Sequence, residues 1–287
     1  MSAKRIGITL GDQAGIGPEI VDAALKAGEW PADVQFEIIG KRIQATPGEP
    51  TWETAKAALE ALEEGASKLQ NGEIDAIVTA PVAKEGLHTV GFEFPGQTEF
   101  FADRLGTENY AMCLAGEHLT VALVTIHVSL AEVPQLLTER EIIRVGKLLE
   151  EFCLRKGVEQ PRIAVCGLNP HAGENGAFGL EDLEIVTPAI KKLNEDHKVP
   201  VFTGPHSADT IFRPAANGEY DAVLCMYHDQ GLIPLKLLDF DTGVNTTLGL
   251  PRPRTSPDHG TAFQIAGQGV ASHSSMLHAI KLAVELA

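Results

Sequence analysis

Short apolar runs alternate along the chain with longer segments in which apolar residues recur every three or four positions. The apolar runs predict buried β-strands, at residues 5–10, 34–39, 74–79, 112–115, 119–126, 162–168, 201–202 and 222–226. Helical spacing and helix-start residues mark other segments, at residues 18–27, 53–70, 100–105, 138–156, 183–194 and 275–286. Strands that alternate with helices predict an α/β fold with a largely parallel sheet.

Length and composition narrow the class of protein. A chain of 287 residues exceeds one typical core, so we expect one large or two medium domains. The net charge of −16 argues against non-specific binding to nucleic acid or to an anionic membrane. An anionic substrate would therefore need a local concentration of positive charge. Lys236, Arg252 and Arg254 lie close together in the sequence and meet that requirement.

The cysteines and the apolar runs bear on location. The four cysteines form no Cys-x-x-Cys pair, and Cys166 and Cys225 lie inside apolar runs, so we expect buried, reduced thiols. The first residues show no signal-peptide pattern, and no run approaches 18 apolar residues, so we expect no membrane span. A cytoplasmic location is the default expectation.

Two turns near the start of the chain are candidate ligand sites. The first strand ends in GDQAGIGPE (11–19), a Gly-rich turn that opens a helix and suits a phosphate or carboxylate. Its spacing is neither that of a dinucleotide fingerprint nor that of a P-loop, so a tight turn that needs small residues explains it equally well. In PGQTE (95–99), Thr98 either caps the next helix or contacts a ligand, and capping is the default.

The stretch from Ala222 to Gly269 holds the densest set of reactive side chains. It begins as a buried strand, breaks at residues 227–231, and continues through Lys236, Asn245, Arg254 and the His259-Gly260 pair. Reactive groups just beyond a strand end are typical of the ligand crevice of an open α/β sheet. An ordinary polar surface loop is the alternative interpretation.

Three histidines each follow an apolar strand: His127, His171 and His228. One such histidine is usually just hydrogen-bonded, but three imidazoles hold a divalent ion and leave a position open for substrate, as in a catalytic site. Neutral imidazole suits Zn²⁺ best and also accepts other transition ions. The sequence leaves open whether the three lie on one subunit. Asp209 and Asp229 are candidate partners of such a centre.

A metal ion with an open coordination position, next to cationic side chains, predicts a reaction class. The metal would lower the pKa of a bound hydroxyl and stabilise the oxyanion, while Lys236 and Arg254 would hold a phosphate or carboxylate. This serves alcohol oxidation when a hydride acceptor is present. It serves a metal-dependent hydrolase or lyase equally well, and a non-catalytic binding protein is a third alternative.

Eight motifs carry a family resemblance and occur in this order: GDQAGIGPE, PGQTEFF, TIH, GLNPHAGENG, ADTIF, MYHDQGL, VNTTLGLPRPRTS and DHGTAFQIAGQG. Together they cover most of the chain and resemble the 4-hydroxythreonine-4-phosphate dehydrogenase (PdxA) family. The segment SPDHGTAFQIAGQG also resembles the nicotinamide-cofactor loop of isocitrate and isopropylmalate dehydrogenases.

The resemblance implies two α/β/α domains with a cleft between them. Residues 1–95 with about 262–287 would form the first domain, and about 96–261 the second, which would carry the metal and substrate residues and the dimer interface. It implies a homodimer with active sites shared between chains. It also implies NAD-dependent oxidation of a phosphorylated hydroxy acid, followed by loss of CO₂, to give an aminoketone phosphate for pyridoxine 5′-phosphate synthesis.

The resemblance also assigns roles by motif. The metal ligands would be His127, His171 and His228, holding one divalent ion per subunit, with Zn favoured and Mg, Co or Mn as alternatives. The substrate-binding positions would be Gln97, Thr98, Lys236, Asn245 and Arg254. The candidate catalytic groups are Asp209, Asp229 and Lys236. NAD would contact Gly11, Asp12, His259, Gly260, Thr261 and Gly267.

Two departures from the family pattern bear on the substrate. Gln97 stands where the family has a histidine, and glutamine hydrogen-bonds but carries no charge and serves as neither acid nor base. The region 41–52 is also shorter than in the family. The alternative substrates are four-carbon sugar-acid phosphates, such as threonate or erythronate 4-phosphate, and cyclic diols.

Overall fold

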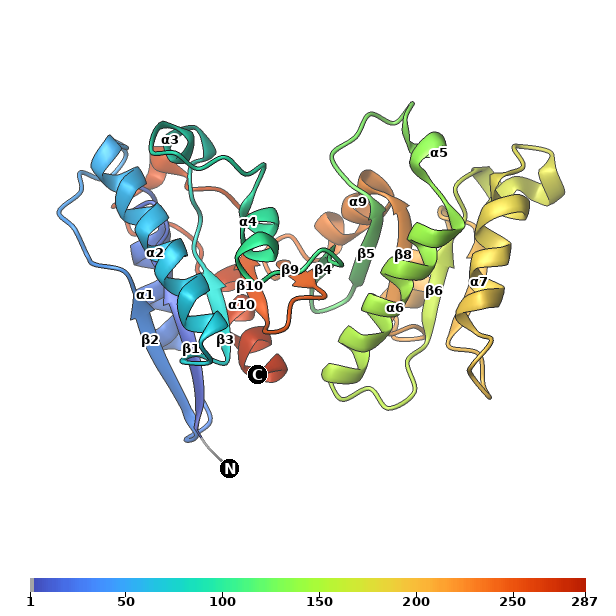
Figure 1. Cartoon of the computed structure of the whole chain (residues 1–287), viewed down its shortest axis with the longest axis horizontal. Helices are drawn as coiled ribbons and strands as arrows, with labels where there is room; N and C mark the ends of the chain where they lie inside the picture. Colours follow the sequence, from blue (N-terminus) through green and yellow to red (C-terminus); the bar gives the residue numbers. More distant parts are fainter. Residues whose placement is uncertain (1–2) are drawn as a thin grey trace. The chain divides into compact units, whose positions relative to one another are not determined.

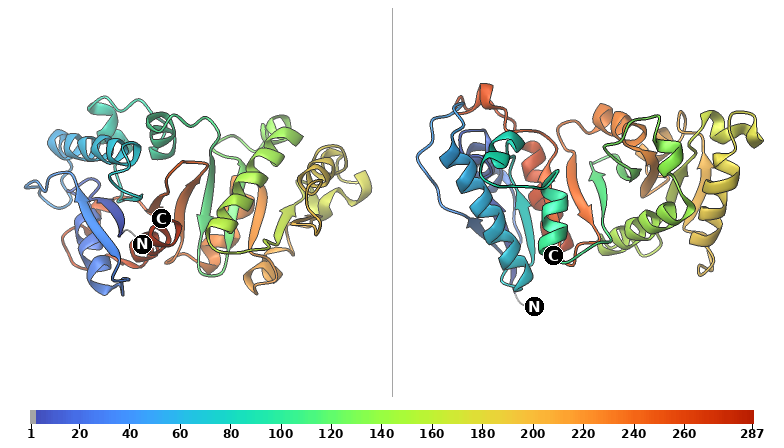
Figure 2. Two further views of the ribbon diagram at one scale, coloured as in Figure 1. Left: turned by 60° about the horizontal axis from the view of Figure 1, so that its bottom comes forward. Right: turned by 45° about the horizontal axis from the view of Figure 1, so that its top comes forward.

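The computed structural model describes residues 3–287 and divides them into two compact units (Figures 1 and 2). Unit 1 combines the residues up to Glu108 with Val244–Ala287, and unit 2 is the continuous segment Asn109–Gly243. The chain therefore leaves unit 1 once and returns to it. Each unit has its own set of strands with helices on both faces.

The unit boundaries differ from the domains expected from the sequence. Residues 96–108 and 244–261 were expected in the second domain, but they belong to unit 1. Helix α4 (Gln97–Arg104) packs against α2 (Trp52–Gln70), and strand β10 (Arg254–Pro257) pairs with β3 (Ala76–Thr79). Strand β10 reads Arg-Thr-Ser-Pro, which offers no apolar run, so the sequence pattern gave no sign of it. The cleft between domains stays a prediction.

Five strands of unit 1 lie in the order β2-β1-β3-β10-β9. Strands β1 (Lys4–Thr9), β2 (Val34–Ile39), β3 and β10 run parallel, and β9 (Val244–Leu248) runs antiparallel to β10. The helices are α1 (Gly17–Ala27), α2, α3 (Lys84–Thr89), α4 and α10 (Ser274–Leu286), with a 3₁₀ turn, η3 (Phe263–Ile265).

Adjacent residues of β10 point to the two faces of this sheet. The Thr255 hydroxyl donates to the Ala279 carbonyl of α10 at 2.8 Å. Arg254 points the other way, with its guanidinium 6.0 Å from the Phe101 ring of α4. Because side chains alternate along a strand, Arg254 shares its face with Ser256 and, through the β3 register, with Ile77 and Thr79.

Unit 2 repeats the plan with strands in the order β4-β5-β8-β6-β7. Strands β5 (Thr120–Thr125), β6 (Ile163–Cys166), β7 (Phe202–His206) and β8 (Ala222–Tyr227) run parallel, and β4 (Ala111–Ala115) is antiparallel to β5. The helices are α5 (Val133–Leu136), α6 (Glu139–Arg155), α7 (Thr187–Leu193), α8 (Phe212–Ala216) and α9 (His228–Leu238). Short irregular helices η1 (Pro170–Gly176) and η2 (Asp182–Val186) precede α7.

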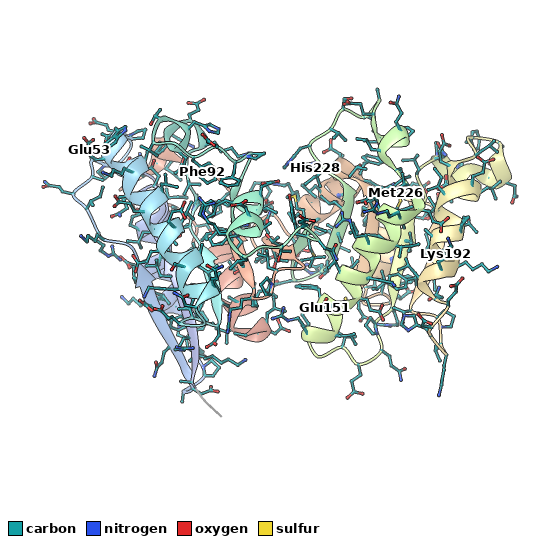
Figure 3. All side chains as sticks on the ribbon, in the orientation of Figure 1. Glu53, Phe92, Glu151, Lys192, Met226 and His228 are labelled. Atoms are coloured by element: carbon teal, nitrogen blue, oxygen red, sulfur yellow. The ribbon has the colours of Figure 1, made fainter. Side chains whose placement is uncertain are left out.

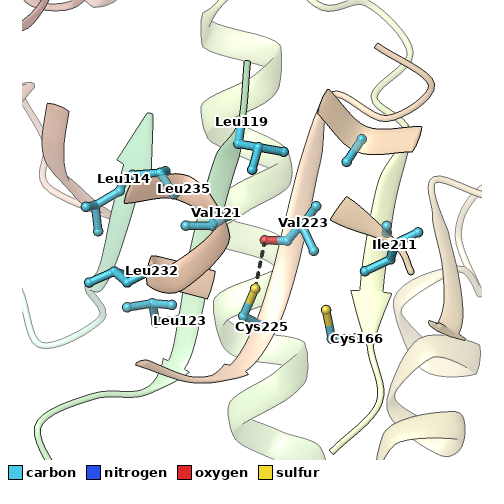
Figure 4. Packing of buried hydrophobic residues seen from close by; sticks show 12 residues of the cluster. Leu114, Leu119, Val121, Leu123, Cys166, Ile211, Val223, Cys225, Leu232 and Leu235 are labelled. Carbon is cyan, nitrogen blue, oxygen red and sulfur yellow. Dashed lines mark hydrogen bonds between the residues drawn. The ribbon is translucent and has the colours of Figure 1, made fainter. Parts of the chain in front are cut away.

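Helix α9 covers one face of the unit 2 sheet. Its Leu232 and Leu235 pack into a buried cluster with Leu114, Leu123 and Cys225 (Figure 4). Cys166 belongs to the same cluster, and all four cysteines are buried and unbonded, as the sequence predicts. Burial raises the pKa of the Cys225 thiol, so it behaves as an inert apolar group.

A buried carboxylate closes the β4–β5 hairpin. Asp239, which follows α9, accepts hydrogen bonds from the backbone amides of His118 and Leu119 at 3.1 and 2.9 Å, and pairs with His118 Nδ1 at 2.7 Å. This hydrogen bond raises the pKa of His118. Gly116 is required beside it, because a Cβ there would lie 2.3 Å from the carboxyl group. In the described range, residues 3–287, no helix is long and apolar enough to cross a bilayer.

Candidate active-site residues

The histidines that follow β5 and β6 sit on left-handed backbone. His127 has φ 45° and His171 has φ 53°. His171 opens a run of five left-handed residues that continues through Ala172, Gly173, Glu174 and Asn175. Each non-glycine L-residue in this conformation costs about 1–2 kcal/mol, and such outliers cluster at functional sites. The backbone therefore marks these two segments independently of the sequence motifs.

A buried carboxylate supports the left-handed turn. Asp182 is 1% exposed. Its Oδ1 accepts from the Leu168 amide at 2.7 Å and its Oδ2 from the Asn169 amide at 3.0 Å. The Asn169 side chain in turn donates to Glu181 Oε2 at 2.8 Å. These bonds fix the chain just before His171.

Two of the three predicted metal ligands come together. The His127 and His228 rings lie 5.7 Å apart between centroids. Both line a cavity of about 230 Å³, together with Thr125, Ile126, Val128, Leu130, Val133, Tyr227 and Asp229. His228, marked in Figure 3, donates from Nδ1 to Asp229 Oδ1 at 2.7 Å, which leaves Nε2 for a ligand.

The donor chemistry of this pair fits a metal ion, but the set is incomplete. Neutral imidazoles with a carboxylate behind one of them are typical ligands of zinc and related ions. Among residues 3–287 of one chain, no three His, Cys, Asp or Glu side chains are grouped so as to hold a metal. His171 thus does not complete a metal-holding group with His127 and His228 within the chain.

The segment at His228 also corrects the sequence analysis. The strand ends at Tyr227, within the expected break at residues 227–231, but the helix α9 that begins at His228 was not expected. Gly231 and Pro234 lower the helix propensity of this segment. The packing of Leu232 and Leu235 against the sheet stabilises the helix in spite of them.

In unit 1, Arg254 is a buried cation. It is 3% exposed, and its Nε and Nη2 donate to Thr79 Oγ1 at 3.1 and 2.7 Å. Its Nη2 also donates to Gln97 Oε1 at 3.1 Å. Burial lowers the pKa of Arg254 to about 10, so it stays charged at neutral pH.

No carboxylate within the described part of the chain forms an ion pair with Arg254; its hydrogen-bond partners are neutral. The carboxylate of Glu99 attracts Arg254 electrostatically, but burial has the larger effect on its pKa. A buried charge without a directly paired counter-charge is costly. An anionic ligand would remove that cost. Arg254 is therefore the strongest anion-site candidate in unit 1.

Two further predicted substrate residues lie in unit 1. Thr98 is inside α4, whose N-cap is Gly96, so the capping role expected by default is wrong. Its hydroxyl lies 3.4 Å from the Thr247 hydroxyl. The Asn245 Oδ1 is buried without a hydrogen-bond partner. Asn245 is opposite Ser256 in the β9–β10 register, so it shares the face of Arg254.

The predicted cofactor residues belong to two loops that contact each other in unit 1. The Ile16 amide donates to the Thr261 carbonyl at 2.9 Å. Gly11 has φ 67° and lies against the Pro81 carbonyl, and buried Asp12 accepts from the Ala14 amide at 3.0 Å, so both shape the turn. Three others are exposed: His259, Gly260 and Gly267. Their contact with NAD stays a prediction.

The remaining predicted catalytic groups are on the surface of unit 2. Asp209 is exposed and accepts from the Ser207 hydroxyl at 2.6 Å. Lys236 is exposed in the last turn of α9. Sequence reasoning missed Thr79, Thr125, Asp182 and Gln230 as supporting residues. Thr79, Thr125 and Gln230 lie at or close to strand ends, which was the available signal. Asp182 had no such signal.

The comparisons with known proteins agree with this geometry. The crystal structure of isocitrate dehydrogenase from Methylococcus capsulatus matches with a TM-score of 0.54 at 18% identity, over 98% of this chain and 85% of that one, which shows the fold alone. The chain is thus an α/β protein of the isocitrate dehydrogenase-like fold group, as predicted.

Two closer relatives and a family model define the family. The model of the pyridoxal phosphate biosynthetic protein PdxA matches residues 17–283. The 4-hydroxythreonine-4-phosphate dehydrogenase of Desulforapulum autotrophicum is 42% identical, over 97% of this chain and 94% of that protein. The crystal structure of 4-hydroxythreonine-4-phosphate dehydrogenase from Klebsiella pneumoniae matches with a TM-score of 0.83 and 37% identity, over 99% of each chain. The chain belongs to the PdxA family, which confirms the predicted resemblance.

Proposed function

We propose that this chain is a dehydrogenase that uses NAD and a divalent metal to oxidise the secondary alcohol of 4-hydroxythreonine 4-phosphate. Loss of CO₂ from the resulting β-keto acid gives an aminoketone phosphate for pyridoxine 5′-phosphate synthesis. Family membership and the names of the relatives support the reaction. The single observation that carries it is the buried charge of Arg254, whose hydrogen-bond partners among the described residues are all neutral and which suits a phosphorylated substrate.

The unit 1 residues bind the anionic group of the substrate. Arg254 donates charge-assisted hydrogen bonds, while Thr79 holds its guanidinium in place. The unpartnered Asn245 amide oxygen accepts from a substrate hydroxyl or amine. Thr98, half-buried in α4, contributes a further hydroxyl. NAD bound by the loops at residues 11–17 and 259–267 supplies the hydride acceptor.

The unit 2 residues serve the reacting alcohol. His127, His171 and His228 would hold a divalent metal, which would supply Lewis acidity to the alcohol. Asp229 orients His228 through Nδ1. Asp209 and Lys236 carry protons to and from the substrate.

A homodimer supplies the missing metal ligand in this proposal. One chain groups His127 and His228 but no third ligand among its described residues, so His171 reaches the centre from a second copy. Large apolar side chains suited to a partner are exposed on α9 and just beyond its end. They are Ile233 and Leu237 in the helix and Phe240 after it, exposed by 66, 82 and 74%. A cytoplasmic location is part of this proposal, because the relatives are metabolic enzymes by name.

A second substrate class is favoured by one observation. The Gln97 oxygen already accepts a hydrogen bond from Arg254, and its NH₂ group adds N–H donors for a ligand. Donors suit a hydroxyl or carboxylate better than an ammonium group. Four-carbon sugar-acid phosphates, such as threonate or erythronate 4-phosphate, are therefore the second candidate.

The test is NADH formation with a panel of divalent metals and both substrates side by side. Turnover mainly with the amino acid supports the first candidate, and turnover mainly with sugar acids supports the second. Substrate consumption without NAD would instead indicate a metal-dependent lyase or hydrolase. Added sulfate should weaken substrate binding more than chloride at equal ionic strength, because sulfate competes for the anion site.

A further inference from the structure

The strand ends that carry the three histidines are connected by buried side-chain hydrogen bonds that centre on Met226. This residue lies at the end of β8, two positions before His228, and is fully buried (Figure 3). Its backbone carbonyl and its backbone amide each form a hydrogen bond with a side chain. The two side chains come from different segments. Each one connects β8 to the segment that precedes a different histidine.

Thr125 forms the first connection. Its hydroxyl donates to the Met226 carbonyl at 2.8 Å, and Thr125 is 7% exposed. Thr125 ends β5, two residues before His127. The bond therefore fixes the β5 end against the β8 end, where the His127 and His228 rings meet.

Gln230 forms the second connection. Its Oε1 accepts from the Met226 amide at 2.7 Å, and its Nε2 donates to the Gly167 carbonyl at 2.7 Å. Gln230 is 7% exposed, so both bonds are shielded from water. Gly167 follows β6 and precedes the left-handed turn of His171. Its position is tight, because a Cβ would lie 2.8 Å from Ala172 and 2.9 Å from Asp182 Oδ1.

We propose that Thr125 and Gln230 are positioning residues that fix, through Met226 and Gly167, the segments carrying His127, His171 and His228 relative to one another. The proposal rests on the proposed function for the metal-binding role of these histidines. Neither residue needs to touch substrate or metal. Their effect reaches the site through backbone placement, and partners of this kind typically change metal affinity by about 10- to 100-fold.

The test uses the full chain in its native oligomer, with Co²⁺ as the metal probe. Gln230→Met removes both amide bonds at similar volume and should weaken Co²⁺ binding about tenfold. Thr125→Val keeps the shape, removes one bond and should weaken Co²⁺ binding less. Amide hydrogen exchange at residues 168–173 should become faster in Gln230→Met, because the Gly167 anchor is lost.

The matched control is Asn194→Ala. Asn194 is also an amide that joins backbone groups of unit 2: it accepts from the Val201 and Phe202 amides at 2.9 and 3.0 Å and donates to the Phe202 carbonyl at 2.8 Å. It joins α7 to β7, away from the Met226 connections. Asn194→Ala should lower the melting temperature and leave Co²⁺ affinity unchanged.

The outcomes separate the two proposals. Wild-type Co²⁺ affinity and unchanged local exchange in Gln230→Met would overturn the positioning role. If that variant does not fold, unchanged Co²⁺ affinity in Thr125→Val overturns it. If the wild-type protein binds no Co²⁺, the metal assignment of the proposed function fails, and exchange at residues 168–173 in Gln230→Met alone decides the positioning role.

Discussion

The two units hold their candidate residues in opposite ways. In unit 1, Arg254 and Asn245 lie on regular strands, and Arg254 is 3% exposed. In unit 2, His127 and His171 are exposed and sit on left-handed backbone just after strands. In unit 1 the free-energy cost comes from burying a charge. In unit 2 it comes from left-handed backbone conformations. The residue proposed to hold an anion is part of the sheet, whereas two of the histidines proposed to share one ion lie on irregular backbone after strand ends and the third starts α9.

The largest effect should come from breaking the histidine set. His171→Ala or His228→Ala should lower turnover by about 10³-fold and abolish bound metal, since a ligand is lost outright. Turnover and metal content measured on the same sample check this. His197→Ala is the control, because His197 pairs with Glu150 at 3.3 Å elsewhere in unit 2. A fully active His171→Ala enzyme would remove His171 from the metal assignment.

Arg254→Met should lower kcat/KM about 100-fold, because charge-assisted bonds to the substrate anion are lost. The same variant should unfold at an equal or higher urea concentration than wild type, since it removes a buried charge whose burial outweighs the attraction of Glu99. Arg252→Met is the control: Arg252 pairs with Asp75 near the surface at 3.2 Å, so both quantities should change little. A large loss of stability with normal kinetics would make Arg254 a purely structural residue.

Part of this comparison could be predicted from sequence. The apolar runs located most strands of both units, and β2 was predicted at its observed bounds, because its apolar residues alternate with exposed polar ones. Strands β9 and β10 were missed, since most of their residues are polar although most are buried, so they leave no apolar run.

The parts of the site that could not be predicted depend on long-range or unusual geometry. The left-handed run that begins at His171 contains four residues with side chains, which give no local sign of that conformation. The bond between Gln230 and Gly167 joins positions 63 residues apart. Motifs located the histidines, but only the fold shows that two of them converge.

A smaller effect should fall on stability in unit 2. Asp239→Ala removes the acceptor for the His118 and Leu119 amides and should cost about 2 kcal/mol of unfolding free energy. Urea denaturation followed by circular dichroism measures this loss. Asp241→Ala, an exposed neighbour, is the control and should be nearly neutral. Equal effects of the two substitutions would show that the hairpin does not depend on this carboxylate.

The smallest effect is a pH dependence confined to unit 2. Asp239 raises the pKa of His118 in the folded state. The stabilisation of the folded state by the His118–Asp239 pair is then complete below the pKa of His118 in the unfolded chain, about 6.5. It is lost as the pH rises through the higher pKa of His118 in the folded protein. Urea midpoints of wild type should therefore fall more than those of His118→Asn between about pH 6 and pH 8. Parallel pH profiles of the two proteins would contradict the assignment.

The discontinuous composition of unit 1 has a consequence for biosynthesis. Strands β1, β2 and β3 leave the ribosome first, but β10, which pairs with β3, and α10, which packs on both, are among the last segments made. Unit 2 is continuous and can fold while unit 1 still lacks two of its strands. During that interval the β3 edge is unpaired and open to the wrong partner. The nascent chain is therefore most exposed to aggregation through its N-terminal strands, until residues 254–286 are released.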